Sequence, residues 1–452
     1  MTTPSDEVTP SSVRRFGHVL VGNARRARRG FYAPRAVGAP TTTRQAEVLN
    51  TAVIAAPTGE EGVLIGRDRL SRAMVAHDAF TAYQRKKVSS PNVLAIGVVG
   101  SGKSSLLKTV YVVRPLILTK RRVVVIDKKP QGGEGEYAEL TRQVSGREPN
   151  RFTLDEDTTR INVMDGTVLA GGGPAVQSQL LVAMAEQSNN DRPLNTWERK
   201  ALRWGQRNVL AAAENGRTGQ LEDLLPWLSR AADAIPDAHP VNRQQMEEAG
   251  LTVRFMFERL LGEELGRLFT GDTSSSLHLS GSLTSFDISQ LPDDGPAVAM
   301  VMSVARMWLL GRLRADRGWA TNFVVEEGWG LVDGPGGRMV QATSKLARGL
   351  GVSTIAALHQ PADVPKDSPA MALIREAQTV HLFRQNRVPD EEACVQLFGL
   401  DPGSQHTLRN LTDGHHLLKI GARPEIYVEH VRSDFEIALT DTDQAMTLGQ
   451  GR

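Results

Sequence analysis

The apolar residues of this chain gather in short runs that end in a glycine or a polar residue, and segments of helical character lie between them. Runs of this length are typical of buried strands in a parallel sheet. They stand at 93–97, 122–127, 283–287, 322–326 and 352–358. Helices are expected between them, at 103–113 and 297–313. This alternation predicts an α/β fold with a mainly parallel sheet and helices on both faces.

A different pattern occupies residues 175–265. Its Ala-, Leu-, Glu- and Arg-rich segments, 196–215 and 241–265, suggest amphipathic helices with no strands between them, which predicts an all-α insertion. Further strand candidates flank the core, at 62–66, 73–76, 379–383, 415–420 and 425–430. We therefore expect a basic arm at 1–57, a core at 58–172 and 271–445, an all-α insertion at 173–270 and a tail at 446–452.

Composition narrows the class of protein. The 452 residues are 40% hydrophobic and 23% charged, as in an ordinary soluble protein. The single cysteine, Cys394, excludes internal disulfides and cysteine-based zinc sites and favours the reducing cytoplasm. No run approaches the roughly eighteen apolar residues of a membrane span, and the N-terminus lacks an apolar signal core. Any role at the inner face of a membrane is then expected to pass through a partner.

The net charge of +2 gives no global signature of nucleic-acid binding, so basic character matters only locally. It is concentrated in the expected arm, at Arg14, Arg15 and the run 25–29. The arm is expected to be mobile. It is either a solvated tail or a segment that binds DNA, acidic lipid or a protein partner.

A phosphate-binding loop is the most specific chemical motif. Residues 97–104 read GVVGSGKS and match G-x-x-x-x-G-K-[ST] between an expected strand and an expected helix. Glycines let backbone N–H groups turn toward phosphate oxygens, and the helix N-terminus adds a favourable dipole. Lys103 is expected to reach the β and γ phosphates of ATP, and Ser104 to bind Mg²⁺. The residues expected to bind the nucleotide are Gly97, Gly100, Ser101, Gly102, Lys103, Ser104 and Ser105.

Two acids close the strand at 322–326. With the phosphate loop present, Glu326 is expected to hold Mg²⁺ together with Ser104, and Glu327 to accept a proton from the attacking water. Standing alone, such a strand end is more often a solvated one. Glu326 is one methylene longer than the aspartate usual at this position, so the two acids can also exchange roles.

Polar residues near the neighbouring strand complete the candidate site. Gln360 follows strand 352–358 and either senses the γ phosphate and orients water or caps the strand, with His359 the less suited choice. Arg348 lies in the sequence between this strand and the acidic one. It is expected to be either an arginine finger that reaches the nucleotide of a neighbouring subunit or a solvated surface residue. Asp127 ends its own strand and is expected to support the site from behind or to form a turn.

These motifs, in this order, resemble the HerA/FtsK superfamily of motor ATPases, and within it the ATPase domain of conjugative type IV secretion ATPases of the TraC type. The resemblance spans roughly 60–445 and includes Glu136-Tyr137, the run 286–291 and the run 360–364. It implies a RecA-like P-loop NTPase core with an all-α insertion and a hexameric ring with nucleotide sites at subunit boundaries. It also implies an arginine finger at Arg348.

Three departures from this family stand out. Glu326 replaces the usual aspartate, and Gly328 stands where a small residue such as alanine is common. The large N-terminal domain of full-length secretion ATPases has no counterpart, which suggests a stand-alone motor that docks on another polypeptide.

Three functions fit these features. The first is an ATPase that couples turnover to substrate transfer or assembly through a membrane-embedded complex. The second is a DNA translocase or coupling protein that pumps DNA through the ring channel, and the third is a nucleotide-dependent scaffold without turnover. The lack of N-terminal spanning helices, and of room for a winged helix after Asp443, favours the first over the second. Intact Lys103, Ser104 and the paired acids argue against the third.

Overall fold

The computed structural model of the chain describes residues 14–15, 18–19, 61–213, 218–237, 239–292, 295–326, 349–359 and 369–440. The chain divides into two compact units, Met1–Pro57 and Thr58–Arg452. In the first unit, the described residues form one antiparallel pair, β1 (Arg14–Arg15) and β2 (His18–Val19). The expected mobility of the basic arm otherwise concerns residues outside the described part of the chain.

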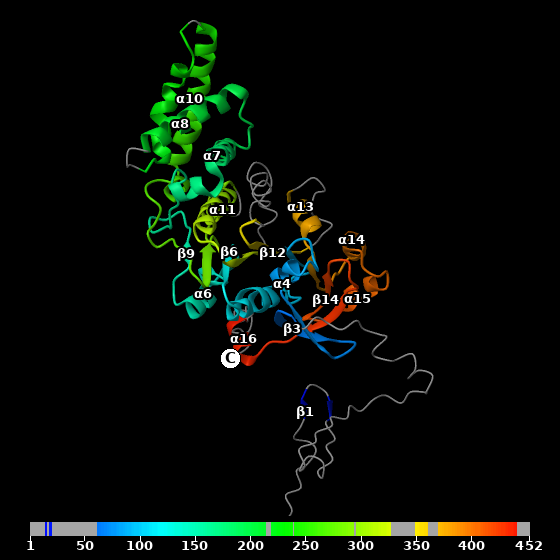
Figure 1. The fold of residues 1–452 in the computed structure, drawn as a ribbon. Coiled ribbons are helices and arrows are strands. Elements are labelled where there is room, and N and C mark those ends of the chain that lie inside the picture. The colour runs from blue at the N-terminus through cyan, green and yellow to red at the C-terminus, as the bar shows by residue number, and fades with distance from the viewer. Residues whose placement is uncertain are drawn as a thin grey trace, which may run out of the picture. The chain divides into compact units, whose positions relative to one another are not determined.

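An eleven-stranded sheet forms the centre of the second unit (Figure 1). From one edge to the other, the strands are β4 (Met74–His77), β3 (Val63–Asp68), β15 (Ile426–His430), β14 (His415–Ile420), β13 (Thr379–Leu382), β5 (Val93–Ile96), β12 (Val352–Leu358), β11 (Ala320–Val325), β6 (Arg121–Asp127), β10 (Leu283–Asp287) and β9 (Asn150–Arg151).

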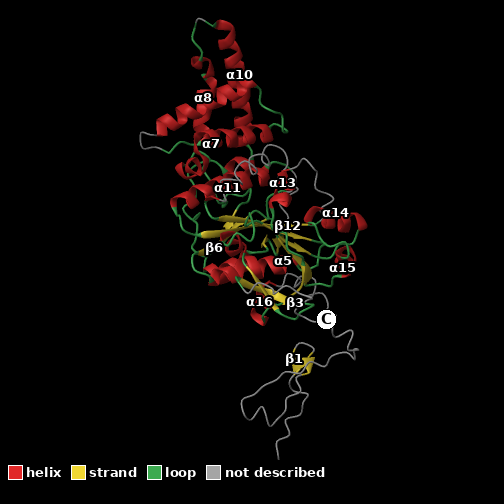
Figure 2. Cartoon of the chain, turned by 45° about the vertical axis from the view of Figure 1, so that its right-hand side comes forward, coloured by secondary structure: helices red, strands yellow, loops and turns green. Residues whose placement is uncertain are grey.

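The strands from β13 to β9 are parallel to their neighbours, and the predicted strand runs of the core fall within this part. Alternate side chains serve opposite faces, as the pleat requires. Leu94 and Ile96 of β5 join the core beneath α7 (Gly166–Ser188) and α11 (Ala297–Ala315). Val93 and Ala95 join the core on the other face, with α5 (Lys103–Leu106). Figure 2 shows α11 and α5 on opposite sides of the strands. The α/β fold with helices on both faces is confirmed.

Strand β13 is the boundary: it is parallel to β5 on one side and antiparallel to β14 on the other, and from β14 to β4 every pair of neighbouring strands is antiparallel. The sequence predicted strands here but gave no direction for them. β14 and β15 are joined by a short turn that contains Gly421, whose positive φ of 54° suits a tight reversal. The sheet is therefore mixed, with its antiparallel part entirely on one side of β5.

The helix expected at 103–113 changes its winding along its length. After α5 it continues as a π-helical segment, η2 (Leu107–Val113), and then as a 3₁₀ segment, η3 (Arg114–Ile117). The Thr109 hydroxyl donates to the carbonyl oxygens of Ser105 (2.7 Å) and Leu106 (3.2 Å), so a side chain takes acceptors inside the helix. Such competition disturbs regular α-helical bonding, and π-helical turns occur often beside functional sites.

Between β9 and β10 the regular elements of the described residues are all helical. They are α7, α8 (Thr196–Ala213), α9 (Leu224–Ser229) and α10 (Pro240–Gly262), with 3₁₀ segments η4 (Leu221–Asp223), η5 (Ala231–Ala234) and η6 (Glu264–Leu268). Figures 1 and 2 show α8 and α10 side by side, on the far side of α7 from the sheet. The other described elements are α4 (Ala79–Gln84), β7 (Pro130–Gln131), β8 (Glu134–Gly135), α6 (Ala138–Ser145), α13 (Pro369–Glu376), α14 (Val388–Phe398), α15 (Ser404–Asn410) and α16 (Asp434–Thr440).

Among the described helices, only α7 has the length and apolar composition of a membrane span. Of its 18-residue apolar stretch, 50% is buried inside the fold. This is a difference from the sequence analysis, which found no such run. The backbone of α7 leaves helical geometry at Gly173 (φ 79°, ψ 175°), next to Pro174. Glu186 near its end pairs with Arg199 of α8 (2.8 Å). Its apolar residues pack against α11, so in this fold α7 is a core helix.

Helices α7 and α11 approach each other through glycines. A Cβ atom at Gly311 would lie 1.8 Å from the carbonyl oxygen of Thr167, and one at Gly171 would lie 2.1 Å from that of Met307. Real Cβ atoms do not come this close to backbone, so neither helix can accept even a methyl group here without moving. Close backbone packing therefore joins the all-α segment to the sheet.

We predict that Gly311→Ala lowers the free energy of unfolding by about 1–3 kcal/mol, because overpacking forces the two helices apart. Gly262→Ala, in α10, is the matched control, since nothing lies within 4 Å of a Cβ atom there. The control should be neutral, or stabilised by up to about 1 kcal/mol through helix propensity. Urea unfolding of both variants and the parent measures the difference. Equal stability of the two variants would contradict the close packing.

Candidate nucleotide-binding site

The phosphate loop leaves the carboxyl end of β5, the strand between β12 and β13. Gly100 (φ 77°) and Gly102 (φ 101°) take left-handed backbone conformations that favour glycine, and α5 begins at Lys103. A Cβ atom at Gly97 would lie 2.5 Å from the Cβ atom of Phe383. Ser101 is buried, and Ser104 and Ser105 are partly exposed. This curled backbone at a helix N-terminus is the geometry that binds phosphate.

Three backbone hydrogen bonds fix the loop to the strands around it. The Gly97 N–H donates to the carbonyl oxygen of Leu358 in β12 (3.2 Å), and the Val98 N–H to that of Arg384 beyond β13 (3.1 Å). The carbonyl oxygen of Ser101 accepts from the N–H of Gly414, just before β14 (3.1 Å). The loop is thus held from both the parallel and the antiparallel part of the sheet.

The side chain of Lys103 folds back into the loop and is only 7% exposed. Its Nζ donates to the carbonyl oxygens of Gly97 (2.7 Å) and Val98 (2.9 Å) and lies 3.5 Å from His359 Nδ1. The ammonium group is therefore already centred on the curled loop. Strand β12 brings His359 to this group, a neighbour that the sequence had ranked below Gln360.

Carboxyl groups meet at the carboxyl ends of three adjacent parallel strands. Asp127 ends β6, Asp287 ends β10 directly opposite it, and Glu326 follows β11. All three side chains are buried. Burial raises the pKa of Asp127 well above its ordinary value, and the nearby Asp287, Glu136 and Glu326 carboxyls raise it further.

The turn between β6 and α6 folds over these carboxyls. Asp127 Oδ2 accepts from the backbone N–H of Tyr137 (2.7 Å), and Asp287 Oδ2 accepts from that of Gly135 (2.9 Å). A Cβ atom at Gly135 would lie 2.2 Å from Asp127 Oδ2, so glycine is required where the backbone passes. The strand-end acids therefore act as acceptors that shape this turn.

Glu326 links the acidic edge to the phosphate loop. Ser104 Oγ donates to Glu326 Oε2 (2.9 Å), and the Tyr137 hydroxyl donates to Glu326 Oε1. Burial raises the pKa of Glu326, and the nearby Glu136 carboxyl adds to this effect. The two hydroxyl donors and the Lys108 ammonium act in the opposite direction, because they favour the charged carboxylate.

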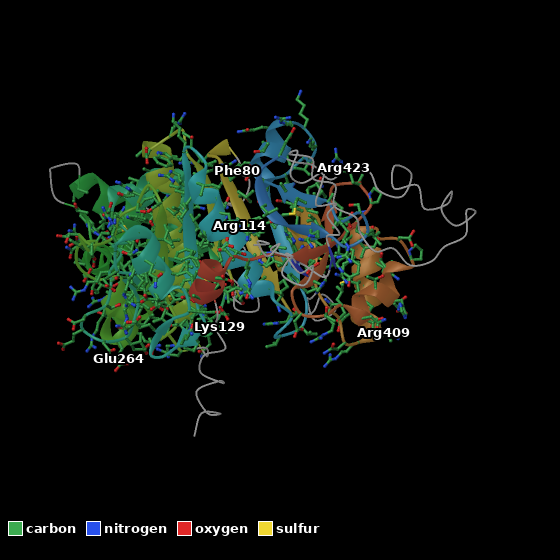
Figure 3. The ribbon with its side chains drawn as sticks, turned by 90° about the horizontal axis from the view of Figure 1, so that it is seen from below. Phe80, Arg114, Lys129, Glu264, Arg409 and Arg423 are labelled. Carbon is green, nitrogen blue, oxygen red and sulfur yellow. The ribbon has the colours of Figure 1, made fainter. Side chains whose placement is uncertain are left out.

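A buried ion pair lies behind Glu326. Lys108 Nζ, from η2, lies 2.9 Å from Glu136 Oε1, and the two side chains are 2% and 1% exposed. The Lys108 ammonium also lies 5.1 Å from the centre of the Tyr137 ring. Lys129, labelled in Figure 3, reaches the other Glu136 oxygen from a more exposed position (3.3 Å). Lys108 thus supplies positive charge inside a group of buried acids.

Ser104 and Glu326 present oxygen atoms of the kind that Mg²⁺ prefers. Within the described part of the chain, no group of three or more His, Cys, Asp or Glu side chains could hold a metal by itself. Magnesium in nucleotide sites takes one or two protein ligands and completes its shell with phosphate and water. The pair therefore fits a magnesium–nucleotide site better than a metal cage built by protein alone.

The structure brings together Lys103, Ser104 and Glu326 of the predicted site. Glu327, Arg348 and Gln360 lie outside the described residues, so their roles remain predictions from the sequence. Sequence reasoning missed Lys108 and gave Tyr137 no role beyond family resemblance. The sequence did contain a signal for them: a lysine, Lys108, in the helix after the loop, and an acid followed by a tyrosine, Glu136 and Tyr137, after the next strand.

Comparison with known proteins finds this fold among solved structures. No family model matches the chain, and no curated protein matches it either. VirB4 of Thermoanaerobacter pseudethanolicus is similar with a TM-score of 0.67 and 20% identity, over 85% of this chain and 100% of that one. The bacterial conjugative coupling protein TrwB, as TrwBdeltaN70, is similar with a TM-score of 0.50 and 12% identity, over 83% of this chain and 90% of that one. The suspected resemblance is confirmed at the level of the fold.

We predict that Lys108→Met lowers the free energy of unfolding by about 3 kcal/mol or more, because Glu136 loses its buried partner. The double variant Lys108→Met/Glu136→Gln should recover part of this loss, since the Glu136 carboxylate no longer lies buried without its partner. Lys200→Met, on the exposed side of α8, should change stability little. Thermal and urea unfolding check all three. A double variant no more stable than Lys108→Met would show that the ion pair is not what stabilises this region.

Proposed function

We propose that this chain is an ATP-hydrolysing motor of a conjugation or type IV secretion-like system, in which ATP turnover drives substrate transfer or complex assembly. The observation that carries the proposal is the contact between Ser104 of the phosphate loop and Glu326 at the end of β11 (2.9 Å). The fold shared with VirB4 and with the conjugative coupling protein TrwB supports this class of system.

In this proposal the loop amides and Lys103 bind the phosphates of ATP. The Lys103 ammonium exchanges its carbonyl acceptors, Gly97 and Val98, for oxygens of the β and γ phosphates, which lie over the same curled backbone. Ser104 and Glu326, which contact each other at 2.9 Å, would supply the protein oxygens that hold Mg²⁺. Magnesium held there would neutralise the negative charge that develops on the phosphates during transfer.

The remaining catalytic roles are proposed from the sequence. Glu327 accepts a proton from the attacking water, Gln360 orients that water against the γ phosphate, and Arg348 stabilises the transition state. We propose that Arg348 acts across a subunit boundary in a hexameric ring. The ring would lie in the cytoplasm, docked on a membrane-embedded transfer complex at the inner face of the membrane.

A second candidate function is DNA translocation through the ring channel, with the basic arm 1–57 as a further contact for DNA. The fold shared with TrwB favours it, since that protein is described as a conjugative coupling protein. The higher similarity to VirB4 leads us to rank the secretion-type motor first.

We predict that Lys103→Ala reduces ATP turnover by about 100-fold or more, because the main cation that faces the phosphates is removed. Lys200→Ala, on the exposed side of α8, is the control and should keep the parent rate. Phosphate release at saturating Mg²⁺–ATP measures both variants. Full turnover in Lys103→Ala would show that this loop does not bind the ATP that is hydrolysed. A parent protein that binds ATP without turnover would favour the scaffold function.

The secretion-type motor predicts little effect of DNA on ATP turnover. Single-stranded and double-stranded DNA, added at low and at physiological salt, should change the rate of ATP turnover by less than about two-fold. A motor that binds the DNA backbone would instead be stimulated by DNA, and more strongly at low salt, because salt weakens phosphate contacts. A version without residues 1–57, assayed in parallel, separates binding by the arm from binding by the ring. Strong stimulation in both versions would favour the translocase.

A further inference from the structure

Glu326 is one methylene longer than the aspartate usual at this position, and the extra length gives its carboxylate additional rotamers. A metal ligand with more freedom binds less tightly unless neighbouring groups hold it in place. Both Glu326 oxygens are held here, one by Ser104 Oγ (2.9 Å) and the other by the Tyr137 hydroxyl. Ser104 is itself an expected ligand, which leaves Tyr137 as the group that fixes the carboxylate from behind.

Tyr137 is held in place by polar contacts as well as by packing. Its side chain is fully buried, and its backbone N–H donates to Asp127 Oδ2 (2.7 Å). Its carbonyl oxygen accepts from the Thr141 hydroxyl (2.7 Å), and the Lys108 ammonium lies 5.1 Å from the ring centre. These contacts come from β6, α6 and η2. The hydroxyl therefore points from a fixed frame toward Glu326.

We propose that Tyr137 is a positioning residue for the magnesium-binding carboxylate. Its hydroxyl holds Glu326 Oε1, so that Oε2 stays directed at Ser104 and at the place of the metal. This inference rests on the proposed function, because it assumes that Ser104 and Glu326 hold the magnesium of Mg²⁺–ATP. It also explains why a glutamate can serve at position 326, because the hydrogen bond from Tyr137 restricts the additional rotamers of the longer side chain.

Tyr137→Phe tests the role, because it removes only the hydroxyl and keeps the ring that packs in the core. We expect the Mg²⁺ concentration for half-maximal turnover to rise about ten-fold, as for other groups that hold a metal ligand in place. The rate at saturating Mg²⁺ and the affinity for ATP without Mg²⁺ should stay near the parent values. A purely structural role would instead lower the amount of folded protein and leave the Mg²⁺ requirement unchanged.

Tyr111→Phe is the matched control. Tyr111 is also a buried tyrosine, on η2, and its hydroxyl bonds to His381 Nε2 (2.6 Å), in β13. This variant loses a buried hydroxyl hydrogen bond of the same kind, yet its Mg²⁺ requirement should match the parent. Thermal unfolding of both variants shows whether their losses of stability are comparable.

Glu326→Asp provides a second test. The shorter carboxylate cannot reach both hydroxyls as Glu326 does, so Tyr137→Phe should have a much smaller effect on the Mg²⁺ requirement in the Glu326→Asp background. Equal effects of Tyr137→Phe in both backgrounds would overturn the proposal. An unchanged Mg²⁺ requirement in the single Tyr137→Phe variant would overturn it as well.

The failure of this inference can be distinguished from failure of the proposed function. A fluorescent ATP analogue, titrated with and without Mg²⁺, reports how strongly the metal increases nucleotide affinity, independently of turnover. If the parent shows Mg²⁺-dependent binding and Tyr137→Phe shows the same dependence, the positioning role is wrong while the site stands. If the parent shows neither turnover nor Mg²⁺-dependent binding, the proposed function has failed and the positioning role fails with it.

Discussion

The arrangement of the whole site depends on how four buried carboxyl groups share one edge of a parallel sheet. Parallel strands end on the same side, so Asp127, Asp287 and Glu326 meet there, and Glu136 joins them from the turn above. Buried like charges are costly unless hydrogen bonds and counter-charges surround them. The backbone N–H groups of the turn, the hydroxyls and Lys108 meet this requirement. The constraint thereby fixes the path of the turn and the direction of Glu326.

The two parts of the sheet contribute differently to the loop. The parallel part supplies β5, from which the loop emerges, and β12, whose carbonyl oxygen accepts the Gly97 N–H. Beyond β13, the backbone before β14 reaches back to the loop through Gly414. The antiparallel strands thus do more than extend the sheet, because they close the second side of the phosphate loop.

Much of this could be predicted from the sequence because it depends on local pattern. The runs at 283–287 and 352–358 are strands with the predicted bounds. The loop motif correctly placed the end of one strand and the start of a helix at Lys103. The antiparallel direction of β14 and β15 depends on pairing between distant strands, which an apolar run does not encode. Lys108 was missed, and Tyr137 was given no role beyond the family resemblance, because their roles depend on burial and on three elements meeting in space. The π-helical segment after α5 likewise has no signature in the periodicity of the sequence, although the Thr109 hydroxyl bonds to a carbonyl oxygen next to it.

The glycine contact between α7 and α11 has a mechanical meaning. Two backbones at this separation interlock, and neither helix can slide along the other without a clash. Helix α11 leads directly into β11, and Glu326 follows that strand. The close contact of α7 with α11 therefore connects the all-α segment, through one continuous stretch of chain, to the strand that ends at the acidic edge. Any shift of α7 at these two glycines has to be accommodated by α11, the helix that precedes the strand ending beside Glu326.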